Sequence, residues 1–107
     1  MNTYQFDFPT NNNYSFIHLA NGNYYKLHIL YDTLTDSYYM NIDKYIDNKF
    51  VNIINSVKLV VGMNLLLQYD YFDIGQMYVI PISDTLYDKD PSAGTIKNGY
   101  FILWEHD

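Results

Sequence analysis

The stretch that decides the fold is residues 14–31, Tyr14-Ser-Phe-Ile-His-Leu-Ala-Asn-Gly-Asn-Tyr-Tyr-Lys-Leu-His-Ile-Leu-Tyr31. Asn21-Gly22 separates two β-prone runs, and it is the strongest short-range signal of a hairpin because both residues accept the positive φ of a type I′ turn. Alternate residues of the second run share a face. One face of the second strand therefore carries Tyr25, Leu27, Ile29 and Tyr31. The other face carries Tyr24, Lys26, His28 and Leu30, and we expect it to be at least half solvated.

Further strands are expected after this hairpin in the sequence. Their composition predicts strands over residues 37–43, 50–61, 76–82 and 100–105. Polar residues interrupt the second of these, so it is expected as one bent strand or two short ones. Residues 63–69 predict a short helix, with Asn64 able to cap its first turn. The fold expected is all-β, a small barrel or sandwich of about six to seven short antiparallel strands, with one short helix near residues 63–70.

The chain of 107 residues fits one domain. Residues 1–13 end in the polar, turn-forming stretch Pro9-Thr-Asn-Asn-Asn13. We therefore expect residues 1–13 to form a flexible N-terminal arm and residues 14–107 to form a single β-rich domain. Residues 83–99 predict a long loop, and loops of that length in small domains are usually functional or disordered.

Charge argues against two classes of partner. The chain has six Lys, no Arg and twelve acidic residues, for a net charge of −6, so phosphate backbones and anionic membrane surfaces repel it. No apolar run approaches the roughly 20 residues of a membrane helix, and the first residues lack the pattern of a signal peptide. We expect neither nucleic acid nor a membrane as partner, and we expect synthesis in the cytoplasm.

Candidate catalytic and metal-binding residues are scarce. The chain has no Cys and three His. Pairing about Asn21-Gly22 places His18 opposite Tyr25 and offsets it from His28, while His106 is expected in a terminal tail. A two-His metal site would need further ligands from elsewhere. We therefore predict no metal and no cofactor.

Catalytic motifs are missing as well. Asp84, Asp88 and Asp90 lack the ordered spacing and the distal Glu of a calcium loop. No G-x-S-x-G, H-E-x-x-H or phosphate-loop motif occurs. The sequence predicts no catalytic residue, and we expect a protein that is not an enzyme.

Tyrosine is the most distinctive residue type. Thirteen Tyr cannot all be buried in a domain of this size, because each hydroxyl needs a hydrogen-bond partner or water. Exposed Tyr on a sheet indicates either a protein interface or a platform for stacking sugars, although an AT-rich genome would also raise the Tyr content. The candidate interface residues are Tyr24, Tyr38, Tyr39, Tyr87, Asp88 and Asp90.

The order of these segments resembles the baseplate plug proteins of contractile phage tails and phage-tail-like particles. The resemblance covers residues 14–104 and begins with the hairpin and Tyr24-x-x-Leu27-x-Ile29-x-Tyr31. It continues through Asp36-x-Tyr38-Tyr39-x-x-Ile42-Asp43, where the family often has a Trp. Its most specific part is Leu59-Val-Val-Gly62-Met-Asn-Leu-Leu-Leu-Gln-Tyr69, which looks like the family's Gly-x-Asp-Leu-Leu segment with Asn64 in place of Asp. Downstream, Tyr78-Val79, Asp90-Pro91, Asn98-Gly99 and Tyr100-Phe101 are similar to the family's ending.

This resemblance implies a structural part of a virion tail baseplate, made in the cytoplasm of a bacterial host. Its partners would be other baseplate and tail proteins such as the hub and the tube, and a homo-oligomer is conceivable. The alternative from another class is a carbohydrate-binding β module that uses exposed tyrosines.

Overall fold

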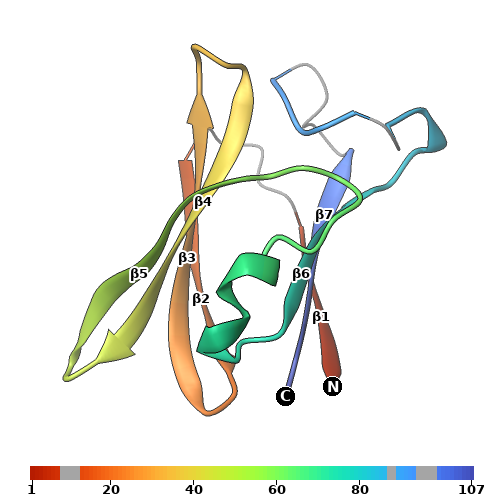
Figure 1. Ribbon diagram of the computed structural model, residues 1–107. Helices are drawn as coiled ribbons and strands as arrows, with labels where there is room; N and C mark the ends of the chain where they lie inside the picture. The colour runs from red at the N-terminus through yellow and green to blue at the C-terminus, as the bar shows by residue number, and fades with distance from the viewer. Residues whose placement is uncertain (8–12, 87–88, 94–98) are drawn as a thin grey trace.

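The computed structural model describes residues 1–7, 13–86, 89–93 and 99–107 (Figure 1). The described residues form seven strands: β1 (Asn2–Asp7), β2 (Asn13–Ala20), β3 (Asn23–Asp32), β4 (Ser37–Ile46), β5 (Lys49–Lys58), β6 (Gln76–Pro81) and β7 (Tyr100–His106). Two short 3-10 helices, η1 (Leu67–Phe72) and η2 (Asp84–Leu86), complete the elements. The all-β prediction with one short helix near residues 63–70 is confirmed. That helix is of the 3-10 type and runs from Leu67 to Phe72, and the brief η2 was not foreseen.

The strands form two antiparallel sheets, one of four strands in the order β2-β3-β4-β5 and one of three in the order β1-β7-β6. One core lies between them, and both sheets contribute fully buried side chains, such as Leu27 and Ile42 from the first and Ile102 and Trp104 from the second. Trp104 also donates its indole N–H to the Ile74 carbonyl at 2.7 Å. The arrangement is a sandwich in which buried side chains alternate with more exposed ones along the strands, apart from a bulge in β5.

The central hairpin has the predicted geometry. Asn21 and Gly22 have φ of 48° and 80°, as a type I′ turn requires. The register pairs His18 with Tyr25 and Ser15 with His28. The predicted offset between the two histidines is therefore confirmed.

The N-terminal residues differ from the prediction. Residues 2–7, expected within a flexible arm, form β1 and pair with β7 from Asn2↔His106 to Asp7↔Phe101. The flexible-arm assignment is wrong for these residues. Tyr4 and Phe6 alternate with exposed neighbours and are half-buried, so the period-two pattern is present. It was missed because Asn2 and Asp7 disfavour strands and a polar, turn-forming stretch follows them.

A crossing segment, residues 59–66, connects the two sheets (Figure 1). It leaves β5 with the Leu59 N–H donating to the Tyr38 carbonyl at 2.8 Å, forms a parallel bridge between Val61 and Val79, and donates the Leu65 N–H to the Met77 carbonyl at 2.8 Å. The predicted strand over 50–61 therefore ends at Lys58, with a bulge that includes Ser56 at φ 57°. The crossing segment occupies the free edge of β6.

Asn64 fixes the end of the crossing segment. Its Oδ1 accepts hydrogen bonds from the Leu66 N–H at 3.0 Å and from the Met77 N–H at 3.1 Å. Asn64 was expected to cap the first turn of a helix. Its side chain instead connects the turn before η1 to the edge of β6. No helix in the described part of the chain is long and apolar enough to span a membrane.

Candidate protein interface

The four-stranded sheet turns one face away from the core, and we call this the outer face. Strand alternation and register assign to it the following residues: Asn13, Ser15, Ile17 and Leu19 of β2; Tyr24, Lys26, His28 and Leu30 of β3; Tyr39, Asn41, Asp43 and Tyr45 of β4; and Phe50, Asn52 and Lys58 of β5. The face therefore mixes apolar, aromatic and polar side chains.

A chain of hydrogen bonds crosses the middle of the outer face. Ser15 Oγ lies 2.8 Å from His28 Nδ1, and His28 Nε2 lies 2.8 Å from Asp43 Oδ2. Asn52 Nδ2 donates to the second carboxylate oxygen, Asp43 Oδ1, at 3.0 Å. Because a carboxylate only accepts, the proton shared by His28 and Asp43 lies on His28 Nε2. Whenever the His28 ring is neutral, the Ser15 hydroxyl donates to its Nδ1.

The electrostatics follow from this chain. Burial alone would raise the pKa of Asp43, but the hydrogen bonds from Asn52 and His28, with the charges of His28 and Lys26, lower it. Hydrolases also use Ser, His and Asp, but there they converge on a site that stabilises an oxyanion. Here the three side chains tie neighbouring strands together across the face of a sheet.

Apolar side chains flank the polar chain. Tyr24 is 53% exposed and Ile17 54%, and Leu19 and Tyr45 are also exposed. The Lys26 ammonium lies 5.8 Å from the centre of the Phe50 ring. Exposed aromatic and aliphatic side chains around satisfied polar groups are the composition of a protein interface.

The structure places the predicted interface tyrosines differently. Tyr24 and Tyr39 both lie on the outer face, exposed and half-buried respectively. Tyr38, expected to be exposed, is only 1% exposed and belongs to the core. Its ring packs beside that of Tyr31, with centroids 5.0 Å apart, and burial, aided by the charge of Asp36, raises its pKa. Strand alternation sends one of two adjacent tyrosines inward, and the sequence alone did not show which.

The predicted loop is tied to the body of the protein. Asp90 is exposed, but its Oδ1 accepts the Val61 N–H at 3.0 Å and so holds the crossing segment. The Ala93 N–H donates to Asp36 Oδ1 at 2.9 Å, and this bond, with the one from the Tyr31 hydroxyl, lowers the pKa of Asp36. Tyr87 and Asp88, the other predicted loop residues, lie outside the described residues.

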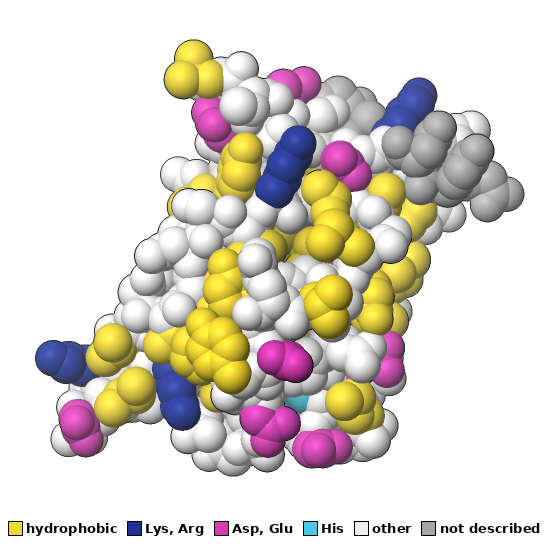
Figure 2. Space-filling model, in the orientation of Figure 1, with side chains coloured by type: hydrophobic (Ala, Val, Ile, Leu, Met, Phe, Trp, Pro, Cys, Tyr) yellow, Lys and Arg dark blue, Asp and Glu magenta, His cyan; other side chains and the backbone are white. Residues whose placement is uncertain are grey.

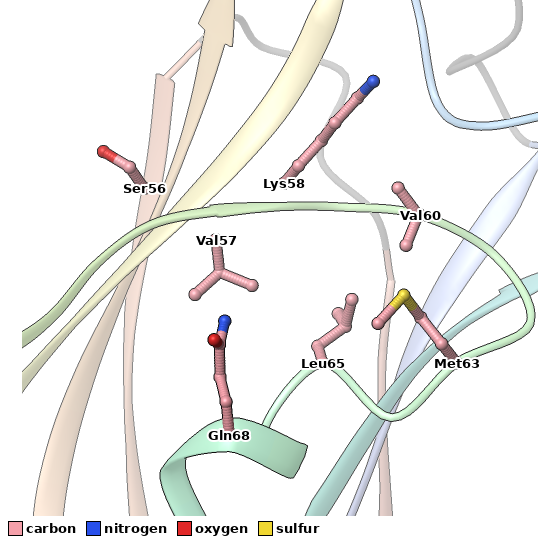
Figure 3. Close-up of a pocket in the computed structure, with 7 residues that line it drawn as sticks. All are labelled: Ser56, Val57, Lys58, Val60, Met63, Leu65 and Gln68. Atoms are coloured by element: carbon pink, nitrogen blue, oxygen red, sulfur yellow. The ribbon is translucent and has the colours of Figure 1, made fainter.

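A groove beside the crossing segment was not foreseen from the sequence. Its volume is about 240 Å³, and it lies between the end of β5 and η1 (Figure 3). Its lining consists of Ser56, Val57, Lys58, Val60, Met63, Leu65 and Gln68. Hydrophobic side chains gather across this face of the molecule (Figure 2), and Met63 and Leu67 are 50% and 66% exposed. Small-molecule pockets usually exceed about 300 Å³, so the groove suits a side chain of a protein partner.

The third histidine is not in a terminal tail as expected. His106 lies in β7, is 2% exposed, and places its Nε2 2.8 Å from Nε2 of His18 on β2. The His106 Nδ1–H donates to the Asp107 carbonyl at 2.7 Å, so in the neutral pair His18 donates to His106. Tyr4 stacks on His106 with centroids 4.5 Å apart, and burial, followed by the charge of His106, lowers the pKa of His18. The pair joins the two sheets.

Metal-ligating side chains do not cluster in the described residues: no group of three or more His, Cys, Asp or Glu there is arranged to hold a metal ion. In the described part of the chain, the outer face and the groove both have a composition suited to contact with another protein.

A family model described as cyanophage baseplate Pam3 plug gp18 matches residues 1–107. The chain belongs to this baseplate plug family. No curated protein matches the chain. Membership places the protein in the baseplate of a virion tail and points to a structural role instead of catalysis.

The family assignment also gives meaning to Asn64, which occupies the place of an Asp in the resemblance drawn from the sequence. Both residue types offer a side-chain oxygen that accepts the two N–H groups of Leu66 and Met77. An Asp at this position would therefore offer the same acceptor at the edge of β6.

Proposed function

We propose that this baseplate plug protein acts through contacts with the hub and tube proteins of a contractile tail, without catalysing a reaction. Its own synthesis would take place in the cytoplasm of the bacterial host. The observation that carries the proposal is the full-length match to the plug family, together with surfaces that have the composition of protein interfaces.

Two surfaces support the proposal. The outer face presents Tyr24 and Tyr39 beside a polar chain that is already satisfied. On another part of the surface, the groove is bordered by exposed Met63, and exposed Leu67 lies beside it. Aromatic residues and Met are enriched at interfaces. Aromatic rings bury a large apolar area at low conformational cost, and the flexible Met side chain adapts to irregular surfaces.

Co-expression tests this function. The chain would be produced with the hub and tube proteins of the same particle, and each pair would be examined for co-elution. We expect a stable complex with at least one of them, weakened by Met63→Asp or Leu67→Asp and unaffected by the control Leu34→Asp, since Leu34 is 94% exposed in a turn. A chain that stays apart from every tail protein but binds glycans would contradict the proposal and favour the carbohydrate-binding alternative.

A further inference from the structure

The outer face is self-complementary, as the strand register shows when it is followed across all four strands. One row reads Ile17, Lys26, Asp43, Asn52 from β2 to β5. Toward the Asn21-Gly22 turn, the next outward row reads Leu19, Tyr24, Tyr45, Phe50, and Tyr45 stands one residue beyond the last β3–β4 pair. Toward the other end of the sheet, a further row reads Asn13, Leu30, Tyr39, Lys58.

A twofold axis parallel to the strands, passing between β3 and β4, would place each row against itself in reverse order. Lys26 would then face Asp43 of the second copy, and Asp43 would face the second copy's Lys26. The same operation opposes Tyr24 to Tyr45, and it opposes Leu30 to Tyr39. These three pairs each meet an opposite charge or another apolar side chain, as an isologous interface requires. The intervening row sets His28 against Asn41, and both side chains already hydrogen-bond within their own copy.

The distribution of charge singles out this face for self-association. Residues 13–58, which form the four-stranded sheet, contain four Lys and four Asp and are neutral overall. The remaining residues contain eight acidic and two basic side chains and so carry the whole net charge of −6. Two copies repel each other through their acidic parts. The neutral sheet is where they can approach.

The polar chain lowers the cost of covering the face. Ser15, His28, Asp43 and Asn52 already bond to one another. Burying a polar group is costly chiefly when it loses its hydrogen-bond partner, and here the partners belong to the same molecule. A second copy can exclude water from this row without leaving those bonds unmade.

We propose that the outer face binds a second copy of this chain around that axis, giving a dimer of face-to-face packed sheets. Four strands of seven residues outline roughly 440 Å² per copy, or about 880 Å² for the pair, which is in the range of weak, transient interfaces. A dissociation constant in the micromolar range is therefore expected. Dimerisation is a property of the free protein, so its test does not depend on the proposed contacts with hub and tube proteins.

Charge reversal tests the axis. Lys26→Asp alone sets Asp against Asp at both symmetric contacts, and Asp43→Lys alone sets Lys against Lys. An equimolar mixture of the two variants restores two opposite-charge contacts in a heterodimer. Sedimentation velocity should show dimerisation for wild type, at least roughly tenfold weaker association for each variant alone, and recovery in the mixture.

A second pair of variants keeps the proposal testable if a charge variant fails to fold. Circular dichroism checks the folding of every variant. Tyr24→Asp should abolish the dimer, because it adds an acidic group opposite Tyr45 and close to the second copy's Asp43. The control Tyr71→Asp, at a residue 72% exposed on η1, should leave the dimer intact. A wild-type chain that remains monomeric at millimolar concentration overturns the proposal. So does a dimer indifferent to Tyr24→Asp, or folded charge variants whose mixture fails to associate.

Discussion

Single side chains hold the connections of this fold, and Asn64 is the clearest case. One oxygen accepts two backbone N–H groups, so Asn64→Leu leaves two donors without partners and should lower the free energy of unfolding by about 2–4 kcal/mol. Asn64→Asp keeps the acceptor and should cost less than about 1 kcal/mol. Urea denaturation measures both, with Asn2→Leu as a surface control. Equal losses for Leu and Asp would contradict the role assigned to the oxygen.

Asp43 makes stability depend on pH at the residue scale. Its pKa is lowered in the folded protein from an ordinary value of 3.8, so its contribution is fully present above that value and disappears as the pH falls through the lower folded pKa. Asp43→Asn should cost about 1–2 kcal/mol of unfolding free energy at pH 7. That difference should shrink below about pH 4. A difference that stays constant from pH 7 to pH 3 would rule out this linkage.

At the scale of elements, the approach of β6 to β7 depends on Gly75. It has φ of 88°, and an added Cβ would overlap the Glu105 carbonyl oxygen of β7. Gly62 has a similar φ of 84° but open space around it. Gly75→Ala should therefore lower the unfolding free energy by at least about 2 kcal/mol more than Gly62→Ala. Thermal or urea unfolding of the two variants checks this, and equal losses would show that only backbone conformation matters.

The elements also show what the sequence could predict. Residues 14–31 encode their own turn and register, because Asn21-Gly22 and the alternation beside it are local signals. The pairing of β1 with β7 joins opposite ends of the chain, and no local sequence pattern predicts this pairing. For the same reason the contact between His18 and His106 could not be foreseen. Within the candidate interface, the predicted Tyr24 and Tyr39 lie on the outer face, whereas Tyr38 was misplaced because alternation alone does not say which face is buried.

On the scale of the whole molecule, a neutral four-stranded sheet stands beside an acidic remainder. Acidic side chains gather at the end where η1 and the chain termini lie (Figure 2). Contacts made through that end should favour basic surfaces and weaken with salt, whereas contacts through the apolar groove should persist. Titrating sodium chloride against the complex with a tail protein would distinguish the two, because a groove contact predicts an affinity that changes little between 50 mM and about 500 mM salt.

The most direct test of the account is a cryo-electron microscopy reconstruction of the contractile tail assembled with this chain. We predict density for the two-sheet fold within the baseplate, in contact with hub or tube proteins, and loss of that density when the chain is omitted. Assembled tails in which the chain is absent from the baseplate, or lies there without touching hub or tube, would contradict it.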